Sequence, residues 1–183
     1  MISLKKKISN NQVAIVTGAG SGIGKTVAIA LIKEGFHVYL IGRNKNNLTK
    51  TKQEAIEKNI DGKCSIFKCD VSIESNVKKL FANIKNKQNR LDLLFNNAGI
   101  SMPVMTIDKI NFQDWKQVID TNINGMFLFA KYSFAIMKEQ RPKGGRIINN
   151  GSISAFSPRP KSAAYTTSKH AISGLTKSLS LDG

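Results

Sequence analysis

Tyr165 and Lys169 are the residues whose types and spacing most directly suggest catalysis. They stand four positions apart in a segment of helical pattern, so they would share one face of a helix. A free phenol titrates at about pH 10, and a neighbouring ammonium group would favour its ionised form. The pair could therefore exchange a proton with a substrate oxygen near neutral pH. Ser152 precedes Tyr165 by thirteen residues and follows a predicted strand, where its hydroxyl could bind that oxygen.

A second candidate site is the glycine-rich turn TGAGSGIG at residues 17–24, which joins a predicted strand to a predicted helix. Glycines at such a junction let the backbone approach a phosphate and point helix N-terminal amides at it. Gly18, Gly22 and Gly24 fit the pattern T-G-x-x-x-G-x-G. This register predicts a site for the pyrophosphate of a dinucleotide.

The same turn also fits a loose P-loop, with Ala19 in the place of the first glycine. That register would make Lys25 a phosphate ligand and Thr26 a magnesium ligand. It also requires an aspartate after a later apolar strand, whereas the fourth predicted strand ends in two asparagines. The turn alone leaves open both registers, and also a glycine turn that serves only close packing.

The end of the second predicted strand favours one cofactor over another. A unit that binds NAD would place a carboxylate there, about 20 residues after the glycines, to hold the ribose hydroxyls. In this sequence Gly42 takes that position and is followed by Arg43 and Asn44. A missing carboxylate and a guanidinium favour the 2′-phosphate of NADP, with NAD as the alternative. Arg43 as an ordinary surface residue also stays open.

Short apolar runs alternate along the chain with longer segments of helical period. The predicted strands are Val13–Thr17, His37–Ile41, Cys64–Cys69, Leu91–Asn96 and Arg146–Asn150. The predicted helices are Gly22–Glu34, Asn44–Lys58, a segment from a Ser72 cap to about Lys87, Phe112–Gln140 and Ala163–Leu181. This alternation predicts an α/β fold, a doubly wound parallel sheet with helices on both faces. Ligands of such sheets bind beyond the carboxyl ends of the strands.

Several motifs occur in one order: TGAGSGIG, NNAG at 96–99, the Asn122 of DTNING, and Ser152-x12-Tyr165-x3-Lys169. With these motifs the sequence resembles the short-chain dehydrogenase/reductase family, from about Gln12 to its last residue. The resemblance implies a Rossmann-like three-layer α/β/α fold in one domain over residues 1–183, lacking the usual C-terminal strands. It also implies a nicotinamide-dependent oxidoreductase that acts on an alcohol or a carbonyl compound.

The resemblance also assigns roles to residues. Tyr165 would be the acid/base, Ser152 would orient the substrate oxygen, and Lys169 would favour the phenolate and hold the nicotinamide ribose. Asn122 would help to position a proton-relay water through Lys169. The set of cofactor-binding residues is Gly18, Ser21, Gly22, Ile23 and Gly24 at the pyrophosphate, Arg43 and Asn44 after the second strand, Asp70 and Val71 at the adenine, and Asn97, Ala98 and Gly99 beneath the ribose, together with Tyr165 and Lys169.

The composition limits the classes of partner. Lys+Arg number 28 and Asp+Glu 12, for a net charge of +16, which would favour any anionic ligand. Because 23 of the cations are lysines spread along the chain, we expect no nucleic-acid partner.

No apolar stretch is long enough to span a membrane, and the two cysteines suggest neither a disulfide framework nor a metal site. We therefore expect a cytoplasmic protein with a small-molecule substrate. The resemblance also implies that copies of the chain form a homodimer or homotetramer through the two long helices.

The sequence departs from the family at its end. Members usually continue for about 60 residues beyond the Tyr/Lys helix, with two more strands and a segment that covers the substrate. We therefore expect the fifth strand at a sheet edge and the last helix packed on one side only. Two interpretations stay open: a fragment of a longer enzyme, or a naturally short, non-catalytic dinucleotide-binding protein. The first is favoured because every expected catalytic residue is retained.

Overall fold

The computed structural model describes residues 12–58 and 62–183. Five parallel strands form one sheet in the order β3-β2-β1-β4-β5. The strands are β1 (Val13–Thr17), β2 (His37–Gly42), β3 (Cys64–Lys68), β4 (Leu93–Asn96) and β5 (Arg146–Asn149). The helices are α1 (Gly22–Lys33), α2 (Lys45–Glu57), α3 (Glu74–Gln88), α4 (Phe112–Ile119), α5 (Gly125–Glu139) and α6 (Ala163–Asp182). The predicted doubly wound parallel sheet is confirmed.

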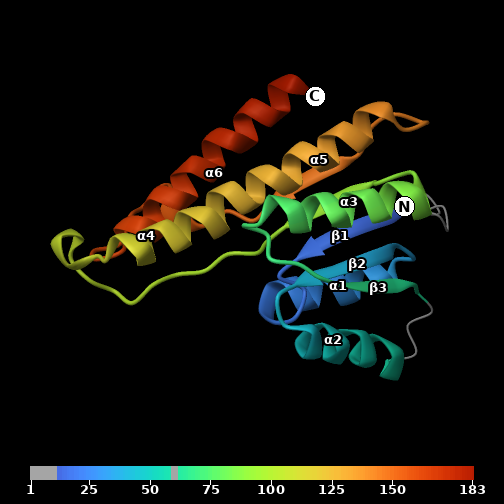
Figure 1. Cartoon of the computed structure of the whole chain (residues 1–183), viewed down its shortest axis with the longest axis horizontal. Helices are drawn as coiled ribbons and strands as arrows, with labels where there is room; N and C mark the ends of the chain where they lie inside the picture. The colour runs from blue at the N-terminus through green and yellow to red at the C-terminus, as the bar shows by residue number, and fades with distance from the viewer. Residues whose placement is uncertain (1–11, 59–61) are drawn as a thin grey trace, which may run out of the picture.

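Helices cover both faces of the sheet, with α1 and α2 on one side and α3 and α5 on the other (Figure 1). Alternate residues of β1 show the division. Ala14 and Val16 pack with α1 and α2, whereas Val13 and Ile15 pack with α3 and α5. All four are at most 1% exposed. Such continuous burial is what a parallel strand covered on both faces requires.

Two predicted boundaries are wrong, the start of β4 and the start of α3, and at both of them a side chain forms hydrogen bonds with backbone groups. The amide of Leu91 donates to Gln140 Oε1 at 2.8 Å and its carbonyl accepts from Gln140 Nε2 at 3.1 Å, so β4 begins only at Leu93. Ser72 does not cap a helix: its amide and hydroxyl both donate to Asp70 Oδ1, at 3.0 and 2.7 Å, in an Asx turn that precedes the helix, and Ile73 is the N-cap residue. Helix α3 begins at Glu74 instead.

The long helix predicted over Phe112–Gln140 is divided. A π-helical segment, Asp120–Asn124, separates α4 from α5. A π turn inserts an extra residue into the helical path and often marks a functional site. The segment carries Asn122, which is completely buried. This interruption therefore places one of the predicted site residues.

The predicted sheet edge is confirmed, since β5 pairs only with β4 in the described part of the chain. Register places Ile148 beside Phe95 and Val16, on the face that α1 covers further along the sheet. Ile148 is nevertheless 40% exposed. The buried residues of α6 all lie in its first half, the last of them being Ile172. The β5 edge and the second half of α6 are thus the least covered parts of the fold.

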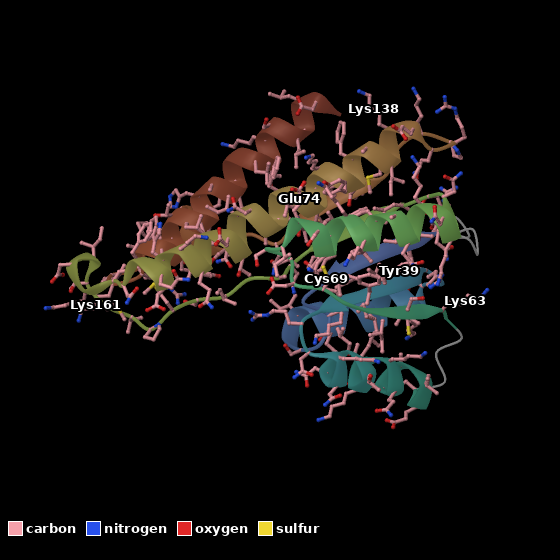
Figure 2. All side chains as sticks on the ribbon, viewed as in Figure 1. Tyr39, Lys63, Cys69, Glu74, Lys138 and Lys161 are labelled. Atoms are coloured by element: carbon pink, nitrogen blue, oxygen red, sulfur yellow. The ribbon has the colours of Figure 1, made fainter. Side chains whose placement is uncertain are left out.

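Apart from the buried Lys169, the described charged side chains lie at least partly exposed at the surface of the fold. Figure 2 shows Lys63, Lys138 and Lys161 at the periphery, whereas Tyr39 and Cys69 lie among the packed elements. Cys64 and Cys69 are both free and pack against opposite faces of the sheet, as expected. Among the helices of residues 12–58 and 62–183, none is long and apolar enough to cross a lipid bilayer.

Candidate active site

The candidate site begins where β1, β4 and β5 end side by side. Thr17 Oγ1 accepts hydrogen bonds from the amides of Asn97 at 2.8 Å and Ala98 at 2.9 Å. Asn97 Nδ2 donates to the Thr17 carbonyl at 3.0 Å, and Asn97 Oδ1 accepts from Asn150 Nδ2 at 2.8 Å. These bonds fix the NNAG loop between the end of β1 and the end of β5.

The glycine turn has the room and the backbone that a pyrophosphate requires. Gly22 has φ +50°, and no atom lies within 4 Å of the position where a Cβ would stand. At Gly24, by contrast, a Cβ would overlap the carbonyl oxygen of Gly18, so the turn folds tightly there. Ser21, the N-cap of α1, makes no capping hydrogen bond through its side chain, and Ile23 is 61% exposed. An open, tightly turned helix N-terminus of this kind fits the phosphates of a dinucleotide.

The P-loop register finds no support, because its two key side chains are engaged elsewhere. Lys25 Nζ lies 2.9 Å from Glu54 Oε2, and Thr26 Oγ1 donates to the Gly22 carbonyl at 3.2 Å. Lys58 and Lys25 together lower the pKa of the Glu54 carboxyl to about 2, so the carboxylate that faces Lys25 is ionised at neutral pH. Lys25 thus points away from the turn toward α2, and not at a bound phosphate.

Helix α6 brings Tyr165 and Lys169 to one face, as their spacing predicts. Lys169 is 4% exposed, and its Nζ donates to the carbonyl of Asn150 at 2.9 Å. The same Nζ lies 5.5 Å from the centroid of the Tyr165 ring. Burial lowers the pKa of the Lys169 ammonium. A partly desolvated cation thus stands next to a phenol that remains partly exposed.

Ser152 lies between β5 and a 3₁₀ turn, Ile153–Ala155, which packs against α6. Its Oγ accepts a hydrogen bond from the Ser154 amide at 3.1 Å. Because the hydroxyl acts there as an acceptor, its own hydrogen is left for another acceptor. Ser152 is partly exposed, like Tyr165. The arrangement allows this hydroxyl to donate to an oxygen of a ligand.

Asn122 joins three segments of the site. Its Oδ1 accepts from the Ile100 amide at 2.8 Å, and its Nδ2 donates to the Ile100 carbonyl at 2.9 Å and to Ser168 Oγ at 3.1 Å. Ser168 Oγ in turn donates to the Tyr165 carbonyl at 2.7 Å. A Cβ on Gly99 would stand 3.3 Å from Asn122 Oδ1. The π segment, the NNAG loop and the first turns of α6 are therefore locked together.

Sequence reasoning missed Thr17, Asn150 and Ser168 as parts of this network. All three bond directly to residues that it did select, namely Asn97, Lys169 and Asn122. The available signal was position: each polar residue directly ends a strand or stands next to a predicted site residue. Thr17 and Asn150 bond to Asn97 over 80 and 53 positions of the sequence, and Ser168 bonds to Asn122 over 46, so spacing alone could not identify them.

The remaining predicted cofactor residues lie around the ends of β2 and β3. Asp70 Oδ1 accepts from both the amide and the hydroxyl of Ser72 at 3.0 and 2.7 Å, while Val71 packs against Gly125 of α5. Arg43 and Asn44 border a separate hollow of about 360 Å³. The structure therefore groups the predicted residues into one cluster at the ends of β4 and β5 and on α6, and a second set at the ends of β2 and β3.

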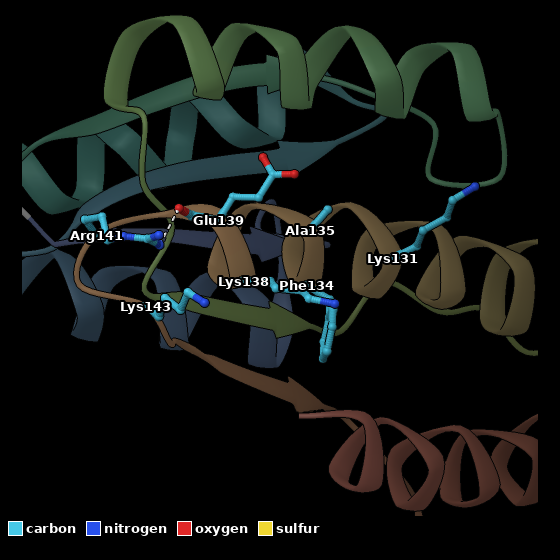
Figure 3. Close-up of a pocket in the computed structure, with 7 residues that line it drawn as sticks. All are labelled: Lys131, Phe134, Ala135, Lys138, Glu139, Arg141 and Lys143. Atoms are coloured by element: carbon cyan, nitrogen blue, oxygen red, sulfur yellow. Dashed lines mark hydrogen bonds between the residues drawn. The ribbon is translucent and has the colours of Figure 1, made fainter.

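A larger hollow, of about 570 Å³, lies elsewhere, along the C-terminal half of α5 (Figure 3). Four cations line it, Lys131, Lys138, Arg141 and Lys143, together with Phe134, Ala135 and Glu139. Arg141 donates to the Glu139 carbonyl at 3.1 Å. Because α5 runs toward the start of β5, this hollow lies at the amino edge of the sheet, opposite the predicted site.

Comparison with known proteins identifies the family. The sequence model of the short chain dehydrogenases matches residues 12–183. The chain belongs to the short-chain dehydrogenase family. The resemblance predicted from the motifs is therefore confirmed over the whole matched range, and the family's members are NAD(P)-dependent oxidoreductases.

Similar dehydrogenases differ in substrate and cofactor. A 3beta-hydroxysteroid dehydrogenase of Mediterraneibacter gnavus is 41% identical over 176 residues, which cover 94% of this chain and 61% of that protein. A metagenomic short-chain oxidoreductase in complex with NADP has a TM-score of 0.86 at 30% identity, covering 92% of this chain and 74% of that one. An NAD⁺-bound xylitol dehydrogenase has a TM-score of 0.88 at 33% identity, with coverages of 97% and 66%. The chain thus spans about two thirds of the length of the relatives that it matches.

Proposed function

We propose that this chain carries the cofactor site and the catalytic residues of an NADP(H)-preferring dehydrogenase that interconverts an alcohol and a carbonyl compound. The observation that carries the proposal is the placement of Lys169. Its buried ammonium lies 5.5 Å from the Tyr165 ring and is tied to Asn150, which also holds the NNAG loop. Through Lys169 and Asn150, the proposed proton donor Tyr165 is thus held close to the NNAG loop, where a cofactor would lie.

The proposed chemistry divides between the protein and the cofactor. A bound nicotinamide supplies or accepts the hydride. In reduction, Tyr165 donates the phenol proton to the carbonyl oxygen of the substrate, and in oxidation its phenolate accepts the proton of the alcohol. Ser152 donates a hydrogen bond to the same oxygen and orients it. Lys169 stabilises the phenolate form of Tyr165 electrostatically.

Asn122 and Ser168 are proposed to position Tyr165 and do not themselves react. Their hydrogen bonds hold the Tyr165 carbonyl, and thus the start of α6, against the NNAG loop. Reacting groups must be held within a fraction of an ångström for efficient transfer. The proton-relay role expected for Asn122 stays a proposal, which these bonds support by fixing its place beside α6.

The cofactor preference rests on Arg43. At the end of β2, Gly42 stands where a carboxylate would bind the ribose hydroxyls of NAD, and the guanidinium of the next residue, Arg43, suits a 2′-phosphate. Asn44 begins the turn into α2, and its Oδ1 accepts from the Asn47 amide at 3.2 Å. Ser21, Gly22 and Ile23 would hold the pyrophosphate, with Asp70 and Val71 near the adenine.

Turnover tests the catalytic part of the proposal. The purified chain is assayed for NADPH oxidation against a panel of ketones, cyclic ketones and ketosteroids, with Tyr165→Phe as the matched variant. We expect activity that falls at least about a hundredfold in Tyr165→Phe, the usual contribution of a general acid, while NADPH binding is retained. Cofactor binding without turnover on any substrate would instead favour a non-catalytic dinucleotide-binding protein.

We also propose that copies of the chain pair through the two long helices. Phe112 and Phe127, on α4 and α5, are 76% and 48% exposed, and Leu181 of α6 is 88% exposed. Exposed apolar side chains on helix faces are typical of association surfaces. Light scattering should give at least twice the mass of 20.1 kDa, and Phe127→Lys should reduce it. A monomer at micromolar concentration would contradict this.

A further inference from the structure

The hollow beside Arg43 contains a cation from a second strand. Its lining residues are Arg43, Asn44, Lys45, Asn46 and Lys68, which supply three positive charges and two amides. No carboxylate is among these described lining residues. Four of them follow directly from the end of β2, but Lys68 ends β3. It is therefore the one member of the set that the chain brings in from elsewhere.

The register between β2 and β3 determines that the Lys68 side chain lies on the side of the sheet where this hollow is found. Lys68 is the direct partner of Gly42 in the parallel pairing of β3 with β2, and the Cys69 amide continues the pairing by donating to the Gly42 carbonyl at 3.0 Å. A Cβ on Gly42 would stand 3.3 Å from Leu48 Cδ2 of α2. Paired residues of neighbouring strands project to the same face, so the Lys68 side chain leaves the sheet on the α2 side. Because Gly42 has no side chain, the Lys68 stem has room to pass toward Arg43.

The hollow also adjoins the glycine turn. The Ala19 amide donates to the Ile41 carbonyl at 3.0 Å, and Thr51 Oγ1 of α2 donates to the Ala19 carbonyl at 2.9 Å. A Cβ on Gly20 would stand 2.9 Å from the Cβ of Asn47. The turn therefore rests on the first turns of α2. A dinucleotide whose pyrophosphate lay on the turn would have its adenosine ribose at the end of β2.

We propose that Lys68 is a second cation for the 2′-phosphate of NADP(H), which it would bind together with Arg43. This inference rests on the proposed function. A 2′-phosphate carries close to two negative charges at neutral pH, which one guanidinium matches only in part. Arg43 offers a planar fork for two of the phosphate oxygens, and Lys68 adds a point charge from the neighbouring strand β3. Lys68 is thus a residue that determines cofactor specificity.

Isothermal titration of the full chain with two small probes tests this inference without turnover. Adenosine 2′,5′-bisphosphate carries the 2′-phosphate, and 5′-AMP lacks it. The variants are Lys68→Gln, Lys68→Arg and Arg43→Gln. Lys33→Gln serves as the control, because it removes the same charge from an exposed lysine at the far end of α1. Melting temperatures of all variants check that the fold is intact.

We expect Lys68→Gln to weaken the bisphosphate about three- to tenfold, the size of a charge-assisted contact at an exposed site. Affinity for 5′-AMP should not change, Lys68→Arg should restore binding, and Lys33→Gln should have no effect. If Arg43→Gln weakens the bisphosphate but Lys68→Gln does not, the inference on Lys68 is overturned and the cofactor proposal stands. Equal weakening of both probes by Lys68→Gln would also overturn it. If neither probe binds the unmodified chain, the proposed cofactor site fails together with this inference.

Discussion

Lys169 is the one buried charged residue in the described part of the chain. Its ammonium has been removed from water and has the Asn150 carbonyl as its hydrogen-bond acceptor. Burying a cation with so little compensation costs free energy of folding, and the lowered pKa of Lys169 is a sign of the same cost. Residues that are retained despite such a cost are typical of functional sites.

The variant Lys169→Met separates function from stability. Methionine keeps the length of the side chain and needs no hydration, so the free energy of unfolding should stay the same or rise by about 1 kcal/mol. Turnover should fall to background. Urea denaturation followed by circular dichroism measures the first quantity. A loss of more than about 2 kcal/mol would mean that Lys169 contributes mainly to folding.

Ser168 offers a second prediction at this scale. It is completely buried, and Ser168→Ala removes both the acceptor of Asn122 Nδ2 and the donor to the Tyr165 carbonyl. We expect a loss of about 1–2 kcal/mol in the free energy of unfolding and a lower kcat with little change in NADPH affinity. Ser173→Ala is the matched control, because Ser173 Oγ donates only to the Lys169 carbonyl one turn earlier in the same helix, at 3.4 Å. Equal effects of the two substitutions would contradict the special position of Ser168.

The turn from β1 into α1 requires glycine at two positions for different reasons: close packing at Gly24 and a positive φ at Gly22. An alanine at position 24 would overlap the Gly18 carbonyl, whereas one at position 22 would meet open space but keep a positive φ. Gly24→Ala should therefore destabilise the protein by more than about 2 kcal/mol. Gly22→Ala should cost about 1 kcal/mol. Thermal denaturation of both variants checks the order, and a larger loss for Gly22→Ala would show that the turn is described wrongly.

Strand β2 begins with a pH-sensitive contact. The His37 ring stacks on Tyr39 with centroids 5.1 Å apart, and its nitrogens lie 2.8 Å from Ser65 Oγ and 3.2 Å from Gln88 Nε2. Burial, with the nearby Lys63 and Lys87, lowers the pKa of His37. The folded protein thus prefers the neutral ring, and the unfolded chain binds the proton more readily.

Stability should consequently fall as the pH drops below about 6.5, the ordinary histidine value, toward the lowered pKa of the folded state. Urea midpoints between pH 7.5 and pH 5 measure this change. His37→Gln should flatten the pH dependence over that interval, since glutamine does not titrate. An identical slope in the variant would assign the effect to other groups.

Features that depend on local sequence patterns could be predicted, whereas features that depend on contacts between distant segments could not. The five strands were predictable because apolar runs such as VAIV report burial on both faces. The π segment was not, because a π turn has the composition of an ordinary helix, and only the family motif singled out Asn122. The prediction of Ser72 as a helix cap was wrong because an Asx turn at Asp70 includes Ser72, and the helix begins one residue later, with Ile73 as its N-cap. Lys68 and Ser168 were missed because their roles depend on register and packing between distant segments.

The whole molecule combines a densely packed centre with sparsely covered parts. Strands β1 and β2 are covered on both faces, whereas Ile148 of β5 and the second half of α6 are exposed. The residues proposed to bind the cofactor and the Tyr165–Lys169 pair nevertheless lie on elements that hydrogen bonds connect. We therefore expect dinucleotide binding to depend on β1, β2, β4 and α6, all of which this chain contains. The net charge of +16 should strengthen the binding of any anionic cofactor at low salt.

A fluorescence titration of the purified chain with NADPH and NADH in parallel tests whether this chain holds an NADP(H)-preferring site. We expect both to bind, with NADPH at least about tenfold tighter, the ratio expected from one charge-assisted pair at the 2′-phosphate. Arg43→Gln should remove most of that difference and leave NADH affinity unchanged. Failure of both cofactors to bind, or a preference for NADH, would contradict this expectation.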